Sequence, residues 1–139
     1  MDNLSNLKRQ HIEIVELINI IKDLSKNEEN INEGIEIAKN INILAGKLTV
    51  HLNSEDKYLY PDLLKSSDLK IKKIGEDYIK EMGNICDEFT KFKNKYNTKS
   101  KLLKNKEEFK SELEITFKLL EKRIDKEDRE LYKLIWSDS

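Results

Sequence analysis

The stretch IAKNINILAGKLTVHLNSEDKYLYPDL, residues 37–63, carries the pattern that decides the fold. Its apolar residues recur at alternating spacings of three and four, the repeat of a helix that turns one face toward a core. Two ionisable residues, His51 and Glu55, interrupt this apolar stripe before it reaches Pro61. Because proline cannot continue a helix without a kink or a break, we expect this helix to bend or end near Pro61.

Three other segments of the chain show the same repeat. Their stripes are Leu4, Leu7, His11, Ile14, Ile18 and Ile21; then Ile71, Ile74, Tyr78, Met82, Ile85, Phe89 and Phe92; and last Phe109, Leu113, Thr116, Leu120, Arg123, Glu127 and Leu131. Polar stretches separate them, among them SKNEEN (25–30) and the basic KNKYNTKSK (93–101), which we interpret as solvated connections. Four amphipathic helices with three short connections predict an all-α protein, an up-down-up-down antiparallel four-helix bundle.

Length and composition favour a single domain spanning residues 1–139. The chain has only 4 Gly and 1 Pro, which suits long helices better than a sheet with many turns. Its 27 acidic and 26 basic residues nearly cancel, so binding to nucleic acid or to a membrane surface is not expected. With no long apolar run and no hydrophobic leader segment, the protein is expected in the cytoplasm. Cys86 is the one cysteine, so an internal disulfide or thiolate cluster is excluded, and it is expected to be a small buried apolar residue.

Five ionisable residues occupy positions that should be apolar: His11, His51, Glu55, Arg123 and Glu127. Charged groups that face a core are tolerated when they are paired or coordinate a metal ion. A spacing of four puts two of them, the histidine and glutamate of the second stripe, one turn apart on the same helix face, where both can bind one ion. Imidazole nitrogen combined with carboxylate oxygen suits iron, zinc or manganese. We therefore predict a metal site in the core.

Each residue also has a simpler interpretation. A lone His11 could be a core histidine bonded to a backbone carbonyl, and Glu127 could be the salt-bridge partner of Arg123 or Lys126. Met82 fits ordinary core packing. Tyr78 either hydrogen-bonds to a ligand or to water, or it reaches its hydroxyl to the bundle surface.

These same segments resemble the hemerythrin-like (HHE cation-binding) family. HLNSEDKYLYPDL (51–63) is similar to the family's histidine, glutamate and Leu-aromatic-Pro signature, LKRQH (7–11) to its first histidine motif, and RIDKEDRELYKL (123–134) to its second histidine-to-carboxylate motif. The resemblance implies that His11, His51, Glu55 and Glu127 are the metal ligands.

Two departures from the family pattern affect the second metal position. Met82 stands where the family commonly has one histidine, with Tyr78 one turn before it, and Arg123 stands where another belongs. The resemblance thus implies one or two iron ions, with zinc or manganese as alternatives. The site has fewer histidine ligands than is usual in the family, and it can be mononuclear. We hypothesise that Arg123 forms a salt bridge with Glu55 or Glu127 and substitutes for one metal ion.

The expected function follows from the smaller number of ligands at this site. For the family that this chain resembles, reversible dioxygen binding implies the transfer of two electrons, one from each of two irons. A single iron cannot provide both electrons. We therefore expect a non-haem iron protein that senses oxygen or nitric oxide, or handles iron, rather than an oxygen carrier or an enzyme. Two alternatives stay open: a metal-free interaction or scaffolding bundle with Arg123 in a polar core network, and a metal-dependent oxidase or iron-sulfur repair enzyme. The sequence leaves the oligomeric state undetermined.

Overall fold

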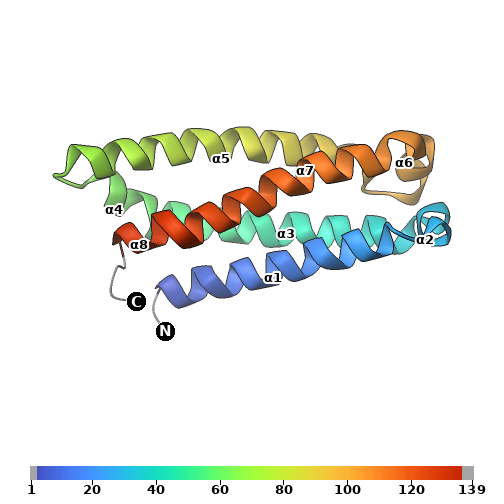
Figure 1. The fold of residues 1–139 in the computed structure, drawn as a ribbon, viewed down its shortest axis with the longest axis horizontal. Coiled ribbons are helices and arrows are strands. Elements are labelled where there is room, and N and C mark those ends of the chain that lie inside the picture. The colour runs from blue at the N-terminus through green and yellow to red at the C-terminus, as the bar shows by residue number, and fades with distance from the viewer. Residues whose placement is uncertain (1–2, 136–139) are drawn as a thin grey trace.

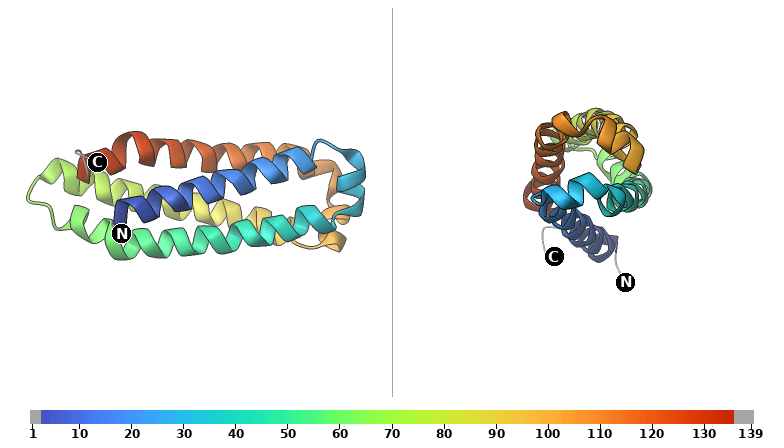
Figure 2. Two further views of the ribbon diagram at one scale, coloured as in Figure 1. Left: turned by 90° about the horizontal axis from the view of Figure 1, so that it is seen from below. Right: turned by 90° about the vertical axis from the view of Figure 1, so that its right-hand side faces the viewer.

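The computed structural model describes residues 3–135, and within this range it contains helices and no strand. Four long helices run antiparallel along the bundle (Figure 1): α1 (Asn3–Leu24), α3 (Ile35–Tyr58), α5 (Leu69–Tyr96) and α7 (Lys106–Lys126). Both α1 and α5 pack against α3 and α7, which closes the four helices into a ring when the bundle is seen along its axis (Figure 2). The predicted all-α, up-down-up-down bundle is confirmed.

Short helices join the long ones at both ends. Helices α2 (Glu28–Glu33) and α6 (Lys99–Lys104) cover one end, whereas α4 (Tyr60–Leu64), the π-helical turn η1 (Glu127–Leu131) and α8 (Tyr132–Ile135) lie at the other end, near both termini (Figure 1). None of the helices formed by residues 3–135 is both long enough and apolar enough to span a bilayer.

The predicted connections at residues 25–30 and 93–101 are confirmed as breaks between the long helices, but parts of both stretches are helical. Asn27 caps α2 by accepting hydrogen bonds from two backbone N–H groups, and the Thr98 hydroxyl caps α6 by accepting a hydrogen bond from one. Helix α5 continues through Tyr96. These segments form helices because each buries an apolar side chain against the core: Ile31, Tyr96 and Leu102.

The extra helix α2 also sets the depth at which α1 and α3 face each other. His11 lies 13 residues before Leu24, where α1 ends, and His51 lies 16 residues after Ile35, where α3 begins. The two histidines are therefore at similar depth, within about 5 Å along the axis. Gly34 makes the sharp change of direction between α2 and α3 with a φ of 69°, a left-handed conformation that favours glycine.

The expected break at Pro61 is confirmed. Helix α3 ends at Tyr58, and Pro61 lies in the first turn of α4, where a missing N–H costs no helical hydrogen bond.

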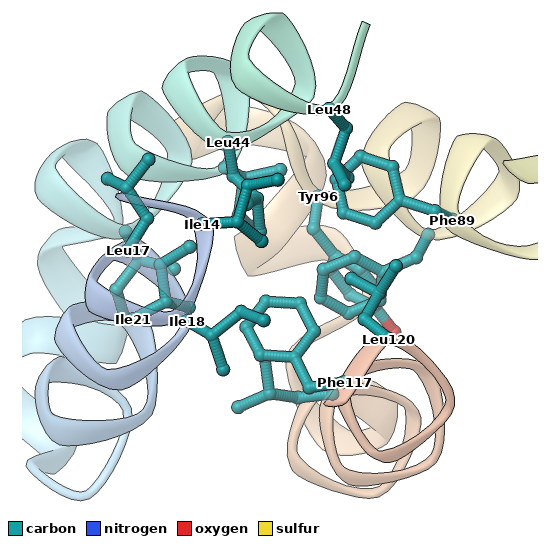
Figure 3. Packing of buried hydrophobic residues seen from close by; sticks show 14 of the residues in the cluster. Ile14, Leu17, Ile18, Ile21, Leu44, Leu48, Phe89, Tyr96, Phe117 and Leu120 are labelled. Atoms are coloured by element: carbon teal, nitrogen blue, oxygen red, sulfur yellow. The ribbon is translucent and has the colours of Figure 1, made fainter. Parts of the chain in front are cut away.

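The core consists of two apolar clusters with a polar layer between them. The larger cluster fills the half of the bundle near α2 and α6, where Phe89, Tyr96 and Phe117 pack against aliphatic side chains of α1 and α3 (Figure 3). The smaller cluster, near the termini, comprises Leu4, Leu7, Leu59, Tyr60, Leu63, Tyr78, Leu131 and Tyr132. The predicted stripes supply most of both clusters, and their ionisable members fall in the layer between them.

Candidate metal centre

Four side chains meet in the polar layer between the two apolar clusters. His11 comes from α1, His51 and Glu55 come from α3, and Glu127 opens the π turn that follows α7. One donor atom from each of the four lies within 4.8 Å of the donor atoms of the others. All four residues are at most 2% exposed. The structure thus brings together the four residues that the sequence singled out as ligand candidates.

The two imidazoles face each other through their Nε2 atoms, which are 3.0 Å apart. Glu127 Oε1 lies 2.8 Å from His11 Nε2 and 3.4 Å from His51 Nε2. Glu55 Oε2 lies 3.4 Å from His51 Nε2. Two nitrogen and two oxygen donors therefore surround one small volume inside the bundle.

The outer nitrogen of each imidazole is fixed by a neighbouring side chain. His11 Nδ1 donates to Asp128 Oδ1 over 2.9 Å, and His51 Nδ1 donates to Gln10 Oε1 over 2.8 Å. The Gln10 amide in turn donates to the Ser54 hydroxyl. Because Nδ1 is the donor in both rings, Nε2 is the nitrogen available to a cation, the usual arrangement around metal-binding histidines.

Arg123 is buried beside this group, and each of its three guanidinium nitrogens donates a hydrogen bond. Its Nε donates to Glu127 Oε2 over 3.0 Å, and its Nη1 donates to Glu81 over 3.2 Å. Nη2 donates to the Tyr60 hydroxyl and to the Tyr78 backbone carbonyl. One oxygen of Glu127 therefore faces the histidines and the other faces the arginine. The residue is placed both as a ligand candidate and as the salt-bridge partner of Arg123.

Tyr78 and Met82 lie outside the group of four. The Tyr78 ring packs under the Arg123 guanidinium at 4.3 Å, and its hydroxyl donates to Glu130 on the outside of the bundle. Met82 is buried and, with the half-buried Cys86, lines a small pocket of about 100 Å³ that opens to the surface between α3 and α5. Tyr78 therefore supports the arginine, Met82 is core packing, and Cys86 is less buried than expected.

The electrostatics of the site favour protonated histidines when no cation is present. Burial alone would lower the pKa of His51, but hydrogen bonds to Glu127 and Glu55 raise it to about 9. The pKa of His11 is also raised, because contacts with Asp128 and Glu127 outweigh its burial. Burial, followed by the charge of Glu127, raises the pKa of Glu55. Burial would raise the pKa of Glu127 too, but hydrogen bonds from both histidines hold it well below its ordinary value.

These shifts predict how the stability of the metal-free protein depends on pH. The pKa of His51 is higher in the fold than its ordinary value of 6.5, so its proton stabilises the fold below pH 6.5, and this stabilisation is lost as pH rises through about 9. We expect the free energy of unfolding to fall by about 3 kcal/mol between pH 6 and pH 9.5, as measured by denaturant titration without metal. A His51→Gln variant should show a much flatter profile, and equal stability of the unchanged chain at both pH values would contradict the assignment.

The donor set fits a metal ion on two structural grounds. Its chemistry, two imidazoles and two carboxylates, matches borderline divalent cations such as iron, zinc and manganese. Moreover, Glu55 is 0% exposed, and its Oε1 has no hydrogen-bond partner among residues 3–135. A buried carboxylate oxygen without a partner is costly, and a cation would satisfy it.

Sequence reasoning missed three residues that touch this group: Gln10, Asp128 and Tyr132. Gln10 and Asp128 each directly flank a ligand candidate along the chain, which is the signal that could have found them. Tyr132 gave no such signal. It lies five residues after Glu127, a spacing that places it off the stripe of an ordinary α-helix.

One comparison with known proteins found a match. Residues 2–135 match the family model of the Hemerythrin HHE cation binding domain. No match was found to a curated protein or to a solved structure. The match covers nearly the whole chain and agrees with the helical bundle and its buried His/Glu group, so this chain belongs to the hemerythrin HHE cation-binding domain family.

Proposed function

We propose that residues 1–139 form one domain that binds a single non-haem iron ion through His11, His51, Glu55 and Glu127. We further propose that it serves in the cytoplasm to sense oxygen or nitric oxide, or to handle iron. The observation that carries the proposal is the set of four buried donor atoms within 4.8 Å of one another, one of them on a carboxylate with an unsatisfied oxygen. Membership of a cation-binding family supports it.

Arg123 is the reason for proposing one ion rather than two. Its guanidinium donates to the outer oxygen of Glu127 and is held by Glu81, Tyr60 and the Tyr78 carbonyl. With the two histidines neutral, two carboxylates and this guanidinium carry a formal charge of about −1, and one divalent ion changes it to about +1. A second divalent ion beside the guanidinium would add two more positive charges in a buried site, which is strongly unfavourable.

When bound, iron would supply a redox-active centre with positions open to small ligands. The chain's own residues orient the ligands and exclude water. Gln10 and Asp128 fix the orientation of the imidazoles, and the apolar clusters on either side of the polar layer keep bulk water away. Because one ferrous ion provides one electron, a sensing or iron-handling role suits this site better than reversible oxygen transport.

A surface groove next to His11 supports access from solvent. It has a volume of about 470 Å³, lies between α1 and α7, and is lined by Lys8, His11, Ile12, Val15, Glu16, Ile124 and Asp128. Two carboxylates, Glu16 and Asp128, and one ammonium group, Lys8, line this path, so its net formal charge of about −1 would attract a cation. The Asp128 side chain is 42% exposed while it contacts His11, so it links the groove to the buried group.

Metal stoichiometry tests the proposal. We expect anaerobic loading with ferrous iron, removal of excess iron and elemental analysis to give about one ion per chain, and Arg123→His to raise this toward two because a neutral ligand would replace a fixed cation. Arg129→His, on the exposed side of the same helical segment, is the matched control and should stay at one. Less than about a tenth of an equivalent in the unchanged chain would contradict the proposal.

The second candidate, a metal-free scaffolding bundle, is favoured by one observation. Arg123, Glu127, Asp128 and both histidines form a connected polar network through direct contacts. Such a network could serve to fix the packing of the bundle. This function would be favoured if the chain retained no metal after iron loading and its thermal stability were the same before and after that treatment.

A further inference from the structure

The Tyr132 hydroxyl borders the proposed metal site. It donates to Glu55 Oε2 over 3.0 Å, and its oxygen is 3.1 Å from His11 Nε2 and 3.5 Å from Glu127 Oε1. The residue is 1% exposed, and its ring stacks on the His11 ring with centroids 5.2 Å apart. One oxygen atom thus contacts three of the four side chains proposed to hold the ion.

A local change of helix type puts this hydroxyl there. Residues Glu127–Leu131 form a π turn, and the Tyr132 N–H donates to the Glu127 carbonyl five residues earlier. In an uninterrupted α-helix a residue five positions along is rotated by roughly 140°, so Tyr132 would point away from the face that carries Glu127. The wider π turn brings both onto the same side. Single π turns are rare and occur frequently at functional sites.

The chemistry of a phenol oxygen suits a trivalent ion better than a divalent one. Phenolate is a hard anionic oxygen ligand and is an established protein ligand of iron. A trivalent ion beside Glu55, Glu127 and Arg123 gives the buried group a formal charge of about +2, and loss of the phenol proton reduces it to about +1. That equals the charge of the divalent site with the phenol intact, and a smaller buried charge is less costly.

We propose that the Tyr132 oxygen is a fifth metal ligand, which this site uses for ferric iron. The inference rests on the metal site proposed above. When ferric iron binds, the O–H bond of Tyr132 breaks, an iron–oxygen bond forms and the proton passes to the buffer. No electron is transferred, because the iron enters in the ferric state.

Absorption and resonance Raman spectroscopy test this assignment. The metal-free protein is loaded with ferric nitrilotriacetate, freed of excess reagent and analysed for iron. We expect a visible phenolate-to-iron charge-transfer band, Raman ring vibrations that shift when the protein carries ring-deuterated tyrosine, and loss of the band in Tyr132→Phe. Tyr60→Phe is the matched control, since this buried tyrosine of the same cluster contacts Arg123 and should leave the band unchanged.

Each result separates the two proposals. Iron bound without a phenolate signal, or a band that persists in Tyr132→Phe, overturns the role of Tyr132 and leaves the four-residue site standing. A chain that retains neither ferric nor ferrous iron overturns both. If Tyr132→Phe does not fold, the isotope shift in the unchanged chain, together with bands retained in Tyr60→Phe and Tyr78→Phe, supports Tyr132; loss of the band in either control overturns it.

Discussion

Replacing Arg123 with methionine is expected to lower the free energy of unfolding of the metal-free protein by about 3–5 kcal/mol. Methionine keeps much of the length of the side chain but removes the guanidinium. That leaves Glu127, 1% exposed, without the partner that donates to its Oε2 at 3.0 Å, and it also removes the side-chain donor to the Tyr78 carbonyl. Glu127 keeps the two histidines at its Oε1, but its Oε2 is left buried beside no positive charge, and loss of one member of a buried ion pair is costly. Urea titration at neutral pH measures the change.

The matched control is Arg129→Met, in the same helical segment. Arg129 is exposed and pairs with Asp125 at the surface, where an ion pair contributes at most about 1 kcal/mol. Equal effects of the two substitutions would show that the Arg123 network does not stabilise the fold and that this arginine does not take the place of a second ion.

Replacing Glu55 with glutamine is expected to weaken ferrous iron binding by more than roughly 100-fold. Loss of a residue that only hydrogen-bonds to a metal ligand already costs up to about that factor. Glutamine preserves shape but removes one of the two buried negative charges, and it places an NH₂ group where the cation needs an oxygen. Loss of His51 in His51→Ala should have an equally large effect. Competition with a coloured chelator under anaerobic conditions measures the affinity.

Asp56→Asn provides the control for this charge change. Asp56 is the next residue on α3 and is exposed, so its removal alters the net charge of the protein by the same amount without touching the buried group. Similar affinities for Glu55→Gln and Asp56→Asn would mean that iron binds to acidic groups at the surface.

The stripe pattern was sufficient to predict the bundle and to select the four residues of the polar layer. His11, His51, Glu55 and Glu127 stood out because each replaces an apolar residue at a helical spacing, and burial of such groups requires a shared explanation. The partners of Arg123 could be predicted only in part. Its bond to Glu127 follows from a spacing of four, whereas Tyr60 and Glu81 come from other helices and depend on how those helices pack.

Other parts of the structure lie beyond what periodicity can predict. Helices α2 and α6 are 6 residues each, too short to display a repeat, and they form because their caps and one buried side chain outweigh a polar composition. Tyr132 was missed for a different reason: its place depends on the π turn, which changes the spacing from four to five within a single turn. Gln10 and Asp128 were missed because they lie beside the stripe and contact the histidines from its edge.

We propose above that four side chains from three helical segments hold one ion. Anomalous diffraction at the iron absorption edge, from crystals of the anaerobically loaded protein, tests it most directly. We expect one peak, in contact with His11, His51, Glu55 and Glu127, with the Arg123 guanidinium still bonded to Glu127. Two peaks in the polar layer, or a peak only at the protein surface, would contradict it.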